Sequence, residues 1–348
     1  MLGVMNQSSS FFKYDAGTPY QAKPPDATLH SGAIRTESPL TAKFLQAFPI
    51  TRVAWRTNQL HDAGFGDRAI QHLVANHVLL RIHYGTYFRR STWEQLPKNA
   101  QERTEITMHH FGTLNRSASA SVYSHSSAAK LHRLHLWQPD NLIHITQTTK
   151  PSSSGCDGRT RLHKSALPSS NITRIGELHV TTLERTVVDC CLTMSYKQSL
   201  IVTDNALHRG ASLKLLQEMA SRLPRHRGVR NLRKVLDHAD GRSESPGETL
   251  TRDLLRELNI ELPQLQQWIV TRQGSYRADF AWPEKRVVLE FDGRTKYFNY
   301  RPTDEAVFLE RKREVALIEA GWTVLRIEWK DLFNEESFKA RVLAALQH

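Results

Sequence analysis

Two carboxylates stand two residues apart at the end of a short apolar run near the C-terminus. The run reads "RVVLEFDG" over residues 286–293, and its acids are Glu290 and Asp292. Side chains alternate along a strand, so Val288, Glu290 and Asp292 are expected on one face. Burying an acid costs several kcal/mol unless it is paired, hydrogen-bonded or bound to a metal. The pattern therefore indicates that a cation or a set of basic side chains compensates these charges.

A third carboxylate is expected opposite the first two. The preceding segment "YRADFAW" contains Asp279, and a Trp-Pro turn at 282–285 predicts an antiparallel hairpin. In that hairpin Asp279 lies opposite Glu290, within one position. Acids this close repel one another unless a cation lies between them, so the pattern predicts a divalent metal ion. All-oxygen ligation favours Mg²⁺ or Mn²⁺ over zinc.

Basic residues surround the same segment. They are Arg277, Lys285, Arg294, Lys296, Arg311, Lys312 and Arg313. An acidic metal site within a positive field suits phosphodiester hydrolysis, because the metal lowers the pKa of a bound water while the cations hold the phosphates. The alternative is structural, namely an acidic hairpin end that pairs with neighbouring arginines and lysines.

The composition of the whole chain agrees with a nucleic-acid partner. Its 348 residues carry a net charge of +12 and a pI of about 9.7, which favours polyanions. The cysteines, Cys156, Cys190 and Cys191, form neither a disulfide framework nor a zinc spacing. No apolar run is long enough to span a membrane, and the first residues lack the pattern of a signal peptide. We expect a cytoplasmic protein with no membrane partner.

Changes in composition and periodicity divide the chain into four segments. Residues 1–40, rich in Ser, Pro, Gly and Thr, are expected to form a disordered leader. A winged helix-turn-helix is expected at 41–95 and a mixed α/β domain at 100–240. A polar linker at 237–248 leads into a C-terminal α/β domain at 243–348. The expected fold class is therefore multidomain α/β.

The order of elements in residues 41–95 predicts DNA binding. Helical patterns at 57–65, with a Thr57 cap, and at 66–77 precede two strand-like runs joined around Gly85. The second helix would enter the major groove. Its outer face carries Arg68, Gln71, His72 and Asn76, and the wing adds Arg81, Arg89 and Arg90. The alternative is a small helical domain whose polar face is only solvated.

The central region gives weaker signals. Its histidines, including His125, His132 and His135, show no metal-ligand spacing, so we predict no metal chemistry for them. A basic run at 221–236 fits either phosphate contacts or an ordinary solvated helix face. No Walker loop, GxGxxG or GxSxG motif is present, which argues against nucleotide hydrolysis, dinucleotide chemistry and serine-hydrolase chemistry.

The C-terminal segment has the clearest periodicity. It predicts helices at 247–258, 305–321 and 336–346, and strands at 266–271, 276–282, 286–293 and 323–329. This αβββαβα order predicts a mixed sheet flanked by helices.

This C-terminal segment resembles the PD-(D/E)xK nuclease fold, in particular the bacterial domains grouped with very-short-patch-repair (Vsr) endonucleases. The resemblance lies in "YRADFAWPEKRVVLEFDG" and "ERKREVALIEAGWTVLRIEW". It implies a restriction-endonuclease-like domain with a metal site formed by Asp279, Glu290 and Glu248, and with Asp292 beside them. The helical arginine of the family matches Arg313.

One position departs from the wider nuclease pattern. The catalytic lysine that usually follows the glutamate by two positions is Asp292 here. We expect Lys296, on the same segment, to supply the missing charge.

The N-terminal half resembles the AbiEi-type abortive-infection antitoxins. The stretch "TNQLHDAGFGDRAIQHLVANHVLLRIHYGTYF" is similar to their winged-helix domain, and "SHSSAAKLHRL" and "TTLERTVVDCC" are similar to the core that follows it. Such antitoxins repress their own operon and oppose a nucleotidyltransferase toxin. The resemblance implies DNA binding and an AbiEi-like central domain.

Three functions stay open on the sequence alone. The first is a Mg²⁺-dependent endodeoxyribonuclease in phage defence or DNA repair, with double-stranded DNA as its partner. The second is an AbiEi-like regulator with a non-cleaving nuclease fold and a cognate toxin; either protein could act as a homodimer. The third is an interaction module, which explains the acid cluster poorly. Convergence of Asp279, Glu290 and Glu248 within metal-bridging distance favours the nuclease, and a scattered arrangement favours the regulator.

Overall fold

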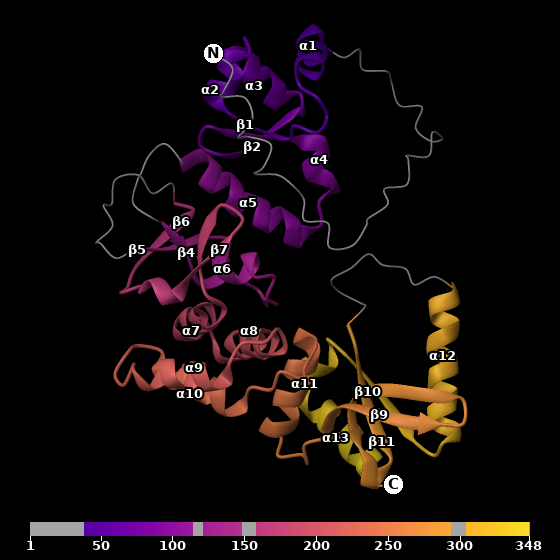
Figure 1. Cartoon of the computed structure of the whole chain (residues 1–348). Coiled ribbons are helices and arrows are strands. Elements are labelled where there is room, and N and C mark those ends of the chain that lie inside the picture. Colours follow the sequence, from indigo (N-terminus) through magenta and orange to yellow (C-terminus); the bar gives the residue numbers. More distant parts are fainter. Residues whose placement is uncertain (1–37, 114–120, 148–157, 294–303, 348) are drawn as a thin grey trace. The chain divides into compact units, whose positions relative to one another are not determined.

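The computed structural model describes residues 38–113, 121–147, 158–293 and 304–347 (Figure 1). Residues 1–37 of the expected leader, Cys156 and Lys296 lie outside these ranges. The chain divides into two compact units, residues 1–122 with 173–180, and residues 123–172 with 181–348. Within the described ranges no helix is long and apolar enough to cross a membrane. The fold class is mixed α/β.

The first unit combines a small antiparallel sheet with helices. Its elements are α1 (Pro39–Ala47), β1 (Ala54–Arg56), α2 (Thr57–Asp62), α3 (Asp67–Ala75), β2 (Leu79–His83), β3 (Thr86–Arg89), α4 (Arg90–Gln95) and α5 (Lys98–Thr113). The strands lie in the order β1-β3-β2, and Gly85, with φ of 70°, stands in the turn of the β2–β3 hairpin. Thr57, expected as a helix cap, is instead the first residue of α2, and Arg56 is the cap.

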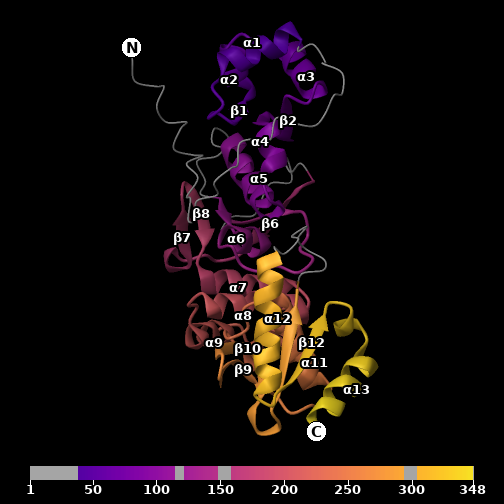
Figure 2. The same ribbon diagram turned by 90° about the vertical axis from the view of Figure 1, so that its right-hand side faces the viewer.

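An aromatic core holds the first three helices together at one end of this unit (Figure 2). The ring of Phe44 in α1 lies 5.2 Å from that of Trp55 and 5.6 Å from that of Phe65. A second cluster forms where Met108 and Phe111 of α5 pack on one buried residue from each strand of the sheet. The first unit therefore extends past residue 95, the end expected from the sequence.

The second unit begins with a small sheet and a group of helices. Its elements here are α6 (His125–Leu131), β5 (Ile143–Gln147), β6 (Thr160–Lys164), η1 (Ser169–Asn171), α7 (Leu183–Thr193), α8 (Tyr196–His208), α9 (Leu213–Ser221) and α10 (Val229–His238). The division between the units falls within β4 (Val122–Tyr123). Most residues of β7 (Ile172–Ile175) and β8 (Leu178–Thr181) belong to the first unit. Cys190 and Cys191 of α7 are free, buried thiols in the helical core.

The C-terminal part of the second unit has the predicted order of helices and strands. It comprises α11 (Pro246–Glu257), β9 (Gln264–Thr271), β10 (Gly274–Trp282), η2 (Pro283–Lys285), β11 (Val287–Asp292), α12 (Asp304–Glu319), β12 (Thr323–Glu328), η3 (Asp331–Phe333) and α13 (Glu335–Leu346). The sheet order is β12-β11-β10-β9. Only β11 and β12 pair in parallel, so the described sheet is mixed.

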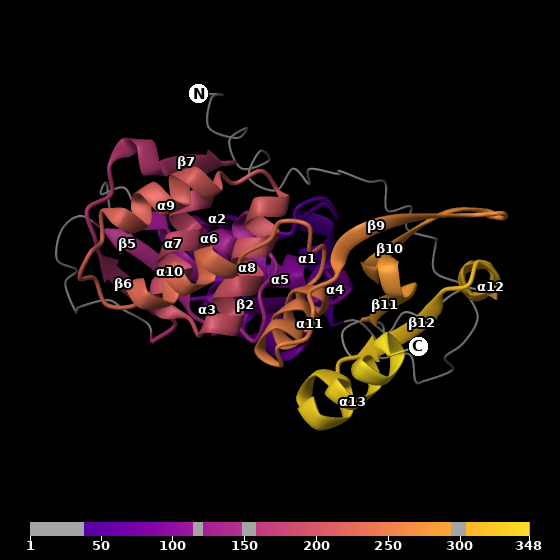
Figure 3. The ribbon, with the colours of Figure 1, turned by 90° about the horizontal axis from the view of Figure 1, so that it is seen from below.

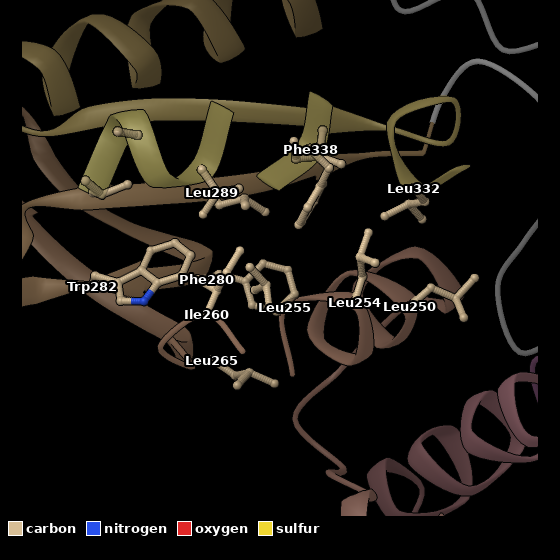
Figure 4. Close-up of a cluster of buried hydrophobic side chains, with 14 of the residues drawn as sticks. Leu250, Leu254, Leu255, Ile260, Leu265, Phe280, Trp282, Leu289, Leu332 and Phe338 are labelled. Carbon is tan, nitrogen blue, oxygen red and sulfur yellow. The ribbon is translucent and has the colours of Figure 1, made fainter. Parts of the chain in front are cut away.

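Helices cover both faces of this sheet. On one face Phe280 and Leu289 pack with Leu254 of α11 and Phe338 of α13 (Figure 4). On the other face, Val288 belongs to a cluster with Leu317 of α12, where the β9–β10 ribbon extends away from α11 (Figure 3). The alternation predicted for β11 is confirmed, because neighbouring strand residues enter different clusters.

A buried ion pair joins the helical and C-terminal parts of the second unit. Arg252 of α11 lies 2.7 Å from Asp204 of α8, and both side chains are buried. Asp204 also accepts hydrogen bonds from the backbone N–H of Asp240 and the hydroxyl of Thr249. Burial raises the pKa of Asp204 to about 6, although Arg252 opposes the shift. The expected polar linker therefore runs beside a fixed α8–α11 contact.

Candidate functional site

The β10–β11 hairpin places the first two acids side by side. Phe280 pairs with Leu289 and Trp282 with Val287. The same antiparallel register brings Asp279 opposite Glu290, as the sequence predicted. The carboxylate of Asp279 accepts a hydrogen bond of 2.9 Å from the backbone N–H of Phe291, which holds it against β11.

The start of α11 brings the third acid to this end of the sheet. Ser245 caps the helix by accepting a hydrogen bond from the N–H of Glu248, and Pro246 occupies the first turn. Gly247 has no room for a side chain, because an added Cβ would lie 1.8 Å from the Phe291 ring. This close approach places Glu248 in the first helical turn next to β11.

Hydrogen bonds orient Glu248 at that position. Its Oε2 atom accepts 2.9 Å bonds from the backbone N–H of Glu244 and from the side chain of Gln266. Gln266 adopts a left-handed backbone conformation, with φ of 53°, within β9. Such strain often marks a functional site, because surrounding structure has to hold it in place.

Arginines approach the acids from two elements. The Nη2 atom of Arg313 in α12 donates to Oε1 of Glu290 at 2.6 Å and to the backbone carbonyl of Arg277 at 2.7 Å. The side chain of Arg277 pairs with Glu244 at 2.7 Å. Part of the predicted basic surround is therefore in contact with acids.

The electrostatics of the three carboxylates are those of a cluster. Burial raises the pKa of Glu248 and of Glu290 to about 7 each, and the charge of Asp279 adds to both shifts. Burial also raises the pKa of Asp279, against the hydrogen bond from Phe291. Near neutral pH these side chains therefore resist carrying their full charge together.

The oxygen atoms of the three acids do not all lie close enough together to bind one metal ion as they stand. A group that could hold a metal ion needs one ligand atom from each of three or more His, Cys, Asp or Glu side chains, all within 4.8 Å of one another. Among the described residues one group meets this distance, and it consists of histidines. Glu248, Asp279 and Glu290 thus interact electrostatically but do not meet that distance.

The other residues predicted for this site are partly exposed, fully exposed or outside the described ranges. Asp292 is the last residue of β11 and is half-buried. Lys296 and Arg294 fall in the segment that the structure does not describe. Lys285, Arg311 and Lys312 are exposed.

The predicted DNA-binding face of α3 is exposed. Ile70 and Leu73 are buried in the aromatic core, whereas Arg68, Gln71, His72 and Asn76 face outward. Asn76 ends the helix by donating to the backbone carbonyl of His72 at 2.8 Å. Arg81 of β2 is exposed too, and its guanidinium lies 5.2 Å from the centre of the Tyr84 ring.

Arg89 is a correction to the predicted DNA-binding set. It is only 4% exposed, and its guanidinium donates to the backbone carbonyls of Arg52 and Pro49. It also lies 5.7 Å and 5.4 Å from the ring centres of Phe44 and Trp55. Burial lowers the pKa of Arg89. Arg89 therefore holds the chain between α1 and β1 and does not reach a ligand on the surface.

Sequence reasoning missed the histidine cluster. It comprises His125, His144 and His163, from α6, β5 and β6. The prediction of no metal chemistry for the histidines of residues 100–240 includes all three, since it rests on spacing along the sequence. The spacings match no zinc motif, because the three elements meet only in the folded chain.

Comparisons with known proteins give little functional information. No family model matches the chain. Uncharacterized protein Rv2248 of Mycobacterium tuberculosis (strain ATCC 25618 / H37Rv) and uncharacterized protein MT2308 of strain CDC 1551 / Oshkosh are each 32% identical to it over 110 residues. The match covers 31% of this chain and 39% of each relative, so the chain spans about two fifths of their length.

One solved structure shows a distant likeness. The crystal structure of RV2827C protein from Mycobacterium tuberculosis matches with a TM-score of 0.37 and 15% identity. The match covers 63% of this chain and 83% of that one. A likeness of this degree carries no weight for function.

Proposed function

We propose that this protein is a divalent-metal-dependent DNA endonuclease. The observation that carries the proposal is the group of Glu248, Asp279 and Glu290, brought from three elements to one end of the sheet. Burial raises the pKa of each, and the charge of Asp279 adds to the rise for Glu248 and Glu290. Carboxylates in that condition gain stability from a bound cation, and perturbed acids of this kind are common at active sites.

The chemistry of the donors fits Mg²⁺ or Mn²⁺. Glu248, Asp279 and Glu290 offer only oxygen ligands, which these ions prefer over nitrogen or sulfur. When bound, such an ion lowers the pKa of a water and neutralises charge on the phosphate. The side chains must first move closer, because their oxygens do not all lie within 4.8 Å in the described arrangement.

The arginines of the site would act on the DNA backbone. Arg313 contacts Glu290 at its Nη2 atom, and an incoming phosphate would compete for the same donor. Transfer of Arg313 from Glu290 to the phosphate would free a carboxylate and hold the substrate at once. Asp292 would complete the acidic set, and Lys296 would orient or activate the attacking water.

The first unit would supply affinity for duplex DNA. The order α1-β1-α2-α3-β2-β3, with an antiparallel β1-β3-β2 sheet, supports the proposal of a winged helix-turn-helix. Arg68, Gln71, His72 and Asn76 would lie in the major groove, and Arg81 would contact phosphate from the wing. This fold analogy favours DNA over RNA.

A second basic surface supports a polyanionic ligand. The loop before α10 and its first turns line a hollow of about 570 Å³. The exposed arginines of this lining are Arg225, Arg227, Arg230 and Arg233. The basic run at 221–236 therefore presents several guanidinium groups together, which suits a phosphate backbone.

A DNA-binding regulator that does not cut is the second candidate. The contact between Arg313 and Glu290 and the incomplete convergence of the acids favour it. Such a regulator would act like the AbiEi antitoxins and would have a cognate toxin as its partner. Either candidate could act as a homodimer.

Incubation of the full chain with supercoiled plasmid and short duplexes distinguishes the two candidates. Mg²⁺, Mn²⁺ and EDTA are compared at equal protein concentration, with DNA binding measured in parallel. Cleavage that requires the metal supports the endonuclease. Binding without cleavage under any of these conditions supports the regulator.

A further inference from the structure

Three histidines of the second unit meet away from the carboxylate site. His125 begins α6, His144 lies in β5 and His163 lies in β6. One ligand atom of each falls within 4.8 Å of the other two. His125 and His144 are buried and His163 is half-buried, so the cluster is largely shielded from solvent.

Hydrogen bonds orient the rings of His144 and His163 so that one nitrogen of each faces the other. Both oxygens of Asp140 lie 3.0–3.1 Å from Nε2 of His144, so this nitrogen carries the proton and donates to the carboxylate. The Nδ1 atom of His144 is then an unprotonated acceptor, and it lies 2.9 Å from Nε2 of His163. A carboxylate on the outer nitrogen is the usual arrangement behind a metal-bound histidine.

His125 is oriented in a similar way. Its Nδ1 atom lies 2.9 Å from the hydroxyl oxygen of Ser124, which also accepts a hydrogen bond from Thr146. This contact leaves Nε2 of His125 for the cluster. His125 has φ of 51°, a left-handed conformation that a residue with a side chain rarely adopts. The fold thus holds the ring in place despite backbone strain.

The cluster is electrically suited to ligation. Burial lowers the pKa of His125 to about 2 and that of His163 to about 4, and neighbouring histidines and Arg161 add to both shifts. Burial also lowers the pKa of His144, against the charge of Asp140. All three rings are therefore neutral at physiological pH, and a neutral imidazole is the form that binds a metal ion.

We propose that His125, His144 and His163 bind a divalent late transition-metal ion, with zinc as the first choice. Three imidazole ligands suit zinc, copper or nickel and not Mg²⁺ or Ca²⁺. The site is distinct from the carboxylate site in position and in ligand type, and it does not depend on the nuclease proposal. Asp140 acts as a positioning residue for His144.

Small side-chain movements would complete the site. Zinc–nitrogen bonds of about 2.0–2.1 Å in a tetrahedral site place ligand nitrogens about 3.3 Å apart. The 2.9 Å contact of His144 and His163 must therefore open slightly. The metal takes the place of the proton on Nε2 of His163, and that proton moves to Nδ1 of the same ring. The ring of His125 is stacked on that of His163, with centroids 3.6 Å apart and an interplanar angle of 16°. It must therefore turn out of this stack to direct Nε2 at the ion. The bound ion would then link α6, β5 and β6, which suits a structural site.

Metal binding to an untagged full chain tests the proposal. The protein is stripped with EDTA, dialysed and titrated with Zn²⁺, and the bound metal is counted by mass spectrometry. We expect one Zn²⁺ per chain, a melting temperature raised by several degrees, and visible absorption bands when Co²⁺ replaces Zn²⁺. A wild-type chain that binds no metal in stoichiometric amount overturns the proposal.

Variants identify the ligands. His163→Gln alters the half-buried member and should abolish both the stoichiometric Zn²⁺ and the Co²⁺ bands, as should His144→Gln. Asp140→Asn should weaken binding about 10- to 100-fold while keeping the bands. The matched control is His132→Gln, because His132 lies just after α6 and bonds to the carbonyl of Thr181 at 2.7 Å, outside the cluster.

Further measurements check that the variants are folded and that zinc does not bind at the carboxylate site. Far-ultraviolet circular dichroism confirms that each variant is folded before metal is counted. Glu290→Gln should bind Zn²⁺ as tightly as wild type, because it lies in the other site. A folded His163→Gln chain that keeps one Zn²⁺ with unchanged affinity contradicts the assignment.

Discussion

Arg313 of α12 and Glu290 of β11 form an ion pair, with Nη2 and Oε1 2.6 Å apart. Glu290 is mostly buried, and the arginine only partly offsets the rise of its pKa that burial and Asp279 cause. The same guanidinium reaches the backbone of Arg277. Arg313 therefore occupies the position from which it can serve either the carboxylate or a phosphate.

Glu290→Gln should abolish cleavage without much loss of DNA affinity. Gln keeps the shape and an oxygen for Arg313 but removes the ligand charge, so the rate should fall by at least about a hundredfold. The measurement is metal-dependent nicking of plasmid beside a binding titration. Glu284→Gln is the matched control, because Glu284 is an exposed acid in the turn of the same hairpin. Equal rates for Glu290→Gln and wild type would remove Glu290 from the site.

Glu248→Gln should change how stability depends on pH. The pKa of Glu248 rises from 4.5 to about 7 on burial, so the folded chain holds this proton more tightly than the unfolded chain. The resulting stabilisation is fully present below about pH 4.5 and is lost as the pH rises through about 7. Gln resembles the protonated acid and can still accept the bonds from Glu244 and Gln266.

Melting curves in EDTA at pH 5 and pH 8 check this expectation. The variant and the wild type should melt closer together at pH 5, and the variant should be the more stable of the two at pH 8. Glu336→Gln, at an exposed position of α13, should show no such change of difference with pH. A variant that is less stable than wild type at pH 8 would show that the charge of Glu248 is compensated.

The sequence predicted the pairing of Asp279 with Glu290 in the hairpin, but not how α11 packs against β11 and brings Glu248 to the same site. Alternation along residues 287–292 and the turn at 282–285 were enough to place Asp279 opposite Glu290. Gly247 and Phe291, by contrast, touch across α11 and β11. Such a contact depends on tertiary packing, so Glu248 entered the prediction only through a family resemblance.

Long-range contacts also explain what the sequence could not predict. His125, His144 and His163 come from separate elements, and no spacing rule links them. Arg89 is the last residue of β3 and is followed by another arginine, and at such a position an exposed arginine is the usual expectation. Its burial arises because backbone carbonyls of residues 49 and 52 lie within reach of its guanidinium.

Arg89→Met should destabilise the first unit and should not act mainly on DNA contacts. Removing the guanidinium takes away its half-buried hydrogen bonds to the carbonyls of Pro49 and Arg52, which costs roughly 2 kcal/mol or more. For a unit of this size that corresponds to a fall in melting temperature of about 10 °C. Thermal denaturation measures the effect, and Arg81→Met, at an exposed position, is the control that should melt like wild type. Identical melting of both variants would contradict the structural role of Arg89.

Arg68→Ala should weaken DNA binding in a way that depends on salt. Arg68 is exposed on α3 beside Gln71 and His72, so a phosphate contact made by its guanidinium would release about one counterion from the duplex. Loss of that contact should lower the slope of log affinity against log salt by ~0.9. Gln71→Ala carries no charge change and should leave the slope unaltered while reducing preference among sequences. Lys339→Ala removes an exposed charge from α13 and serves as the control. Binding titrations of the full chain at several salt concentrations give the slopes, and the same slope for Arg68→Ala as for Lys339→Ala would mean that this face of α3 does not bind the DNA backbone.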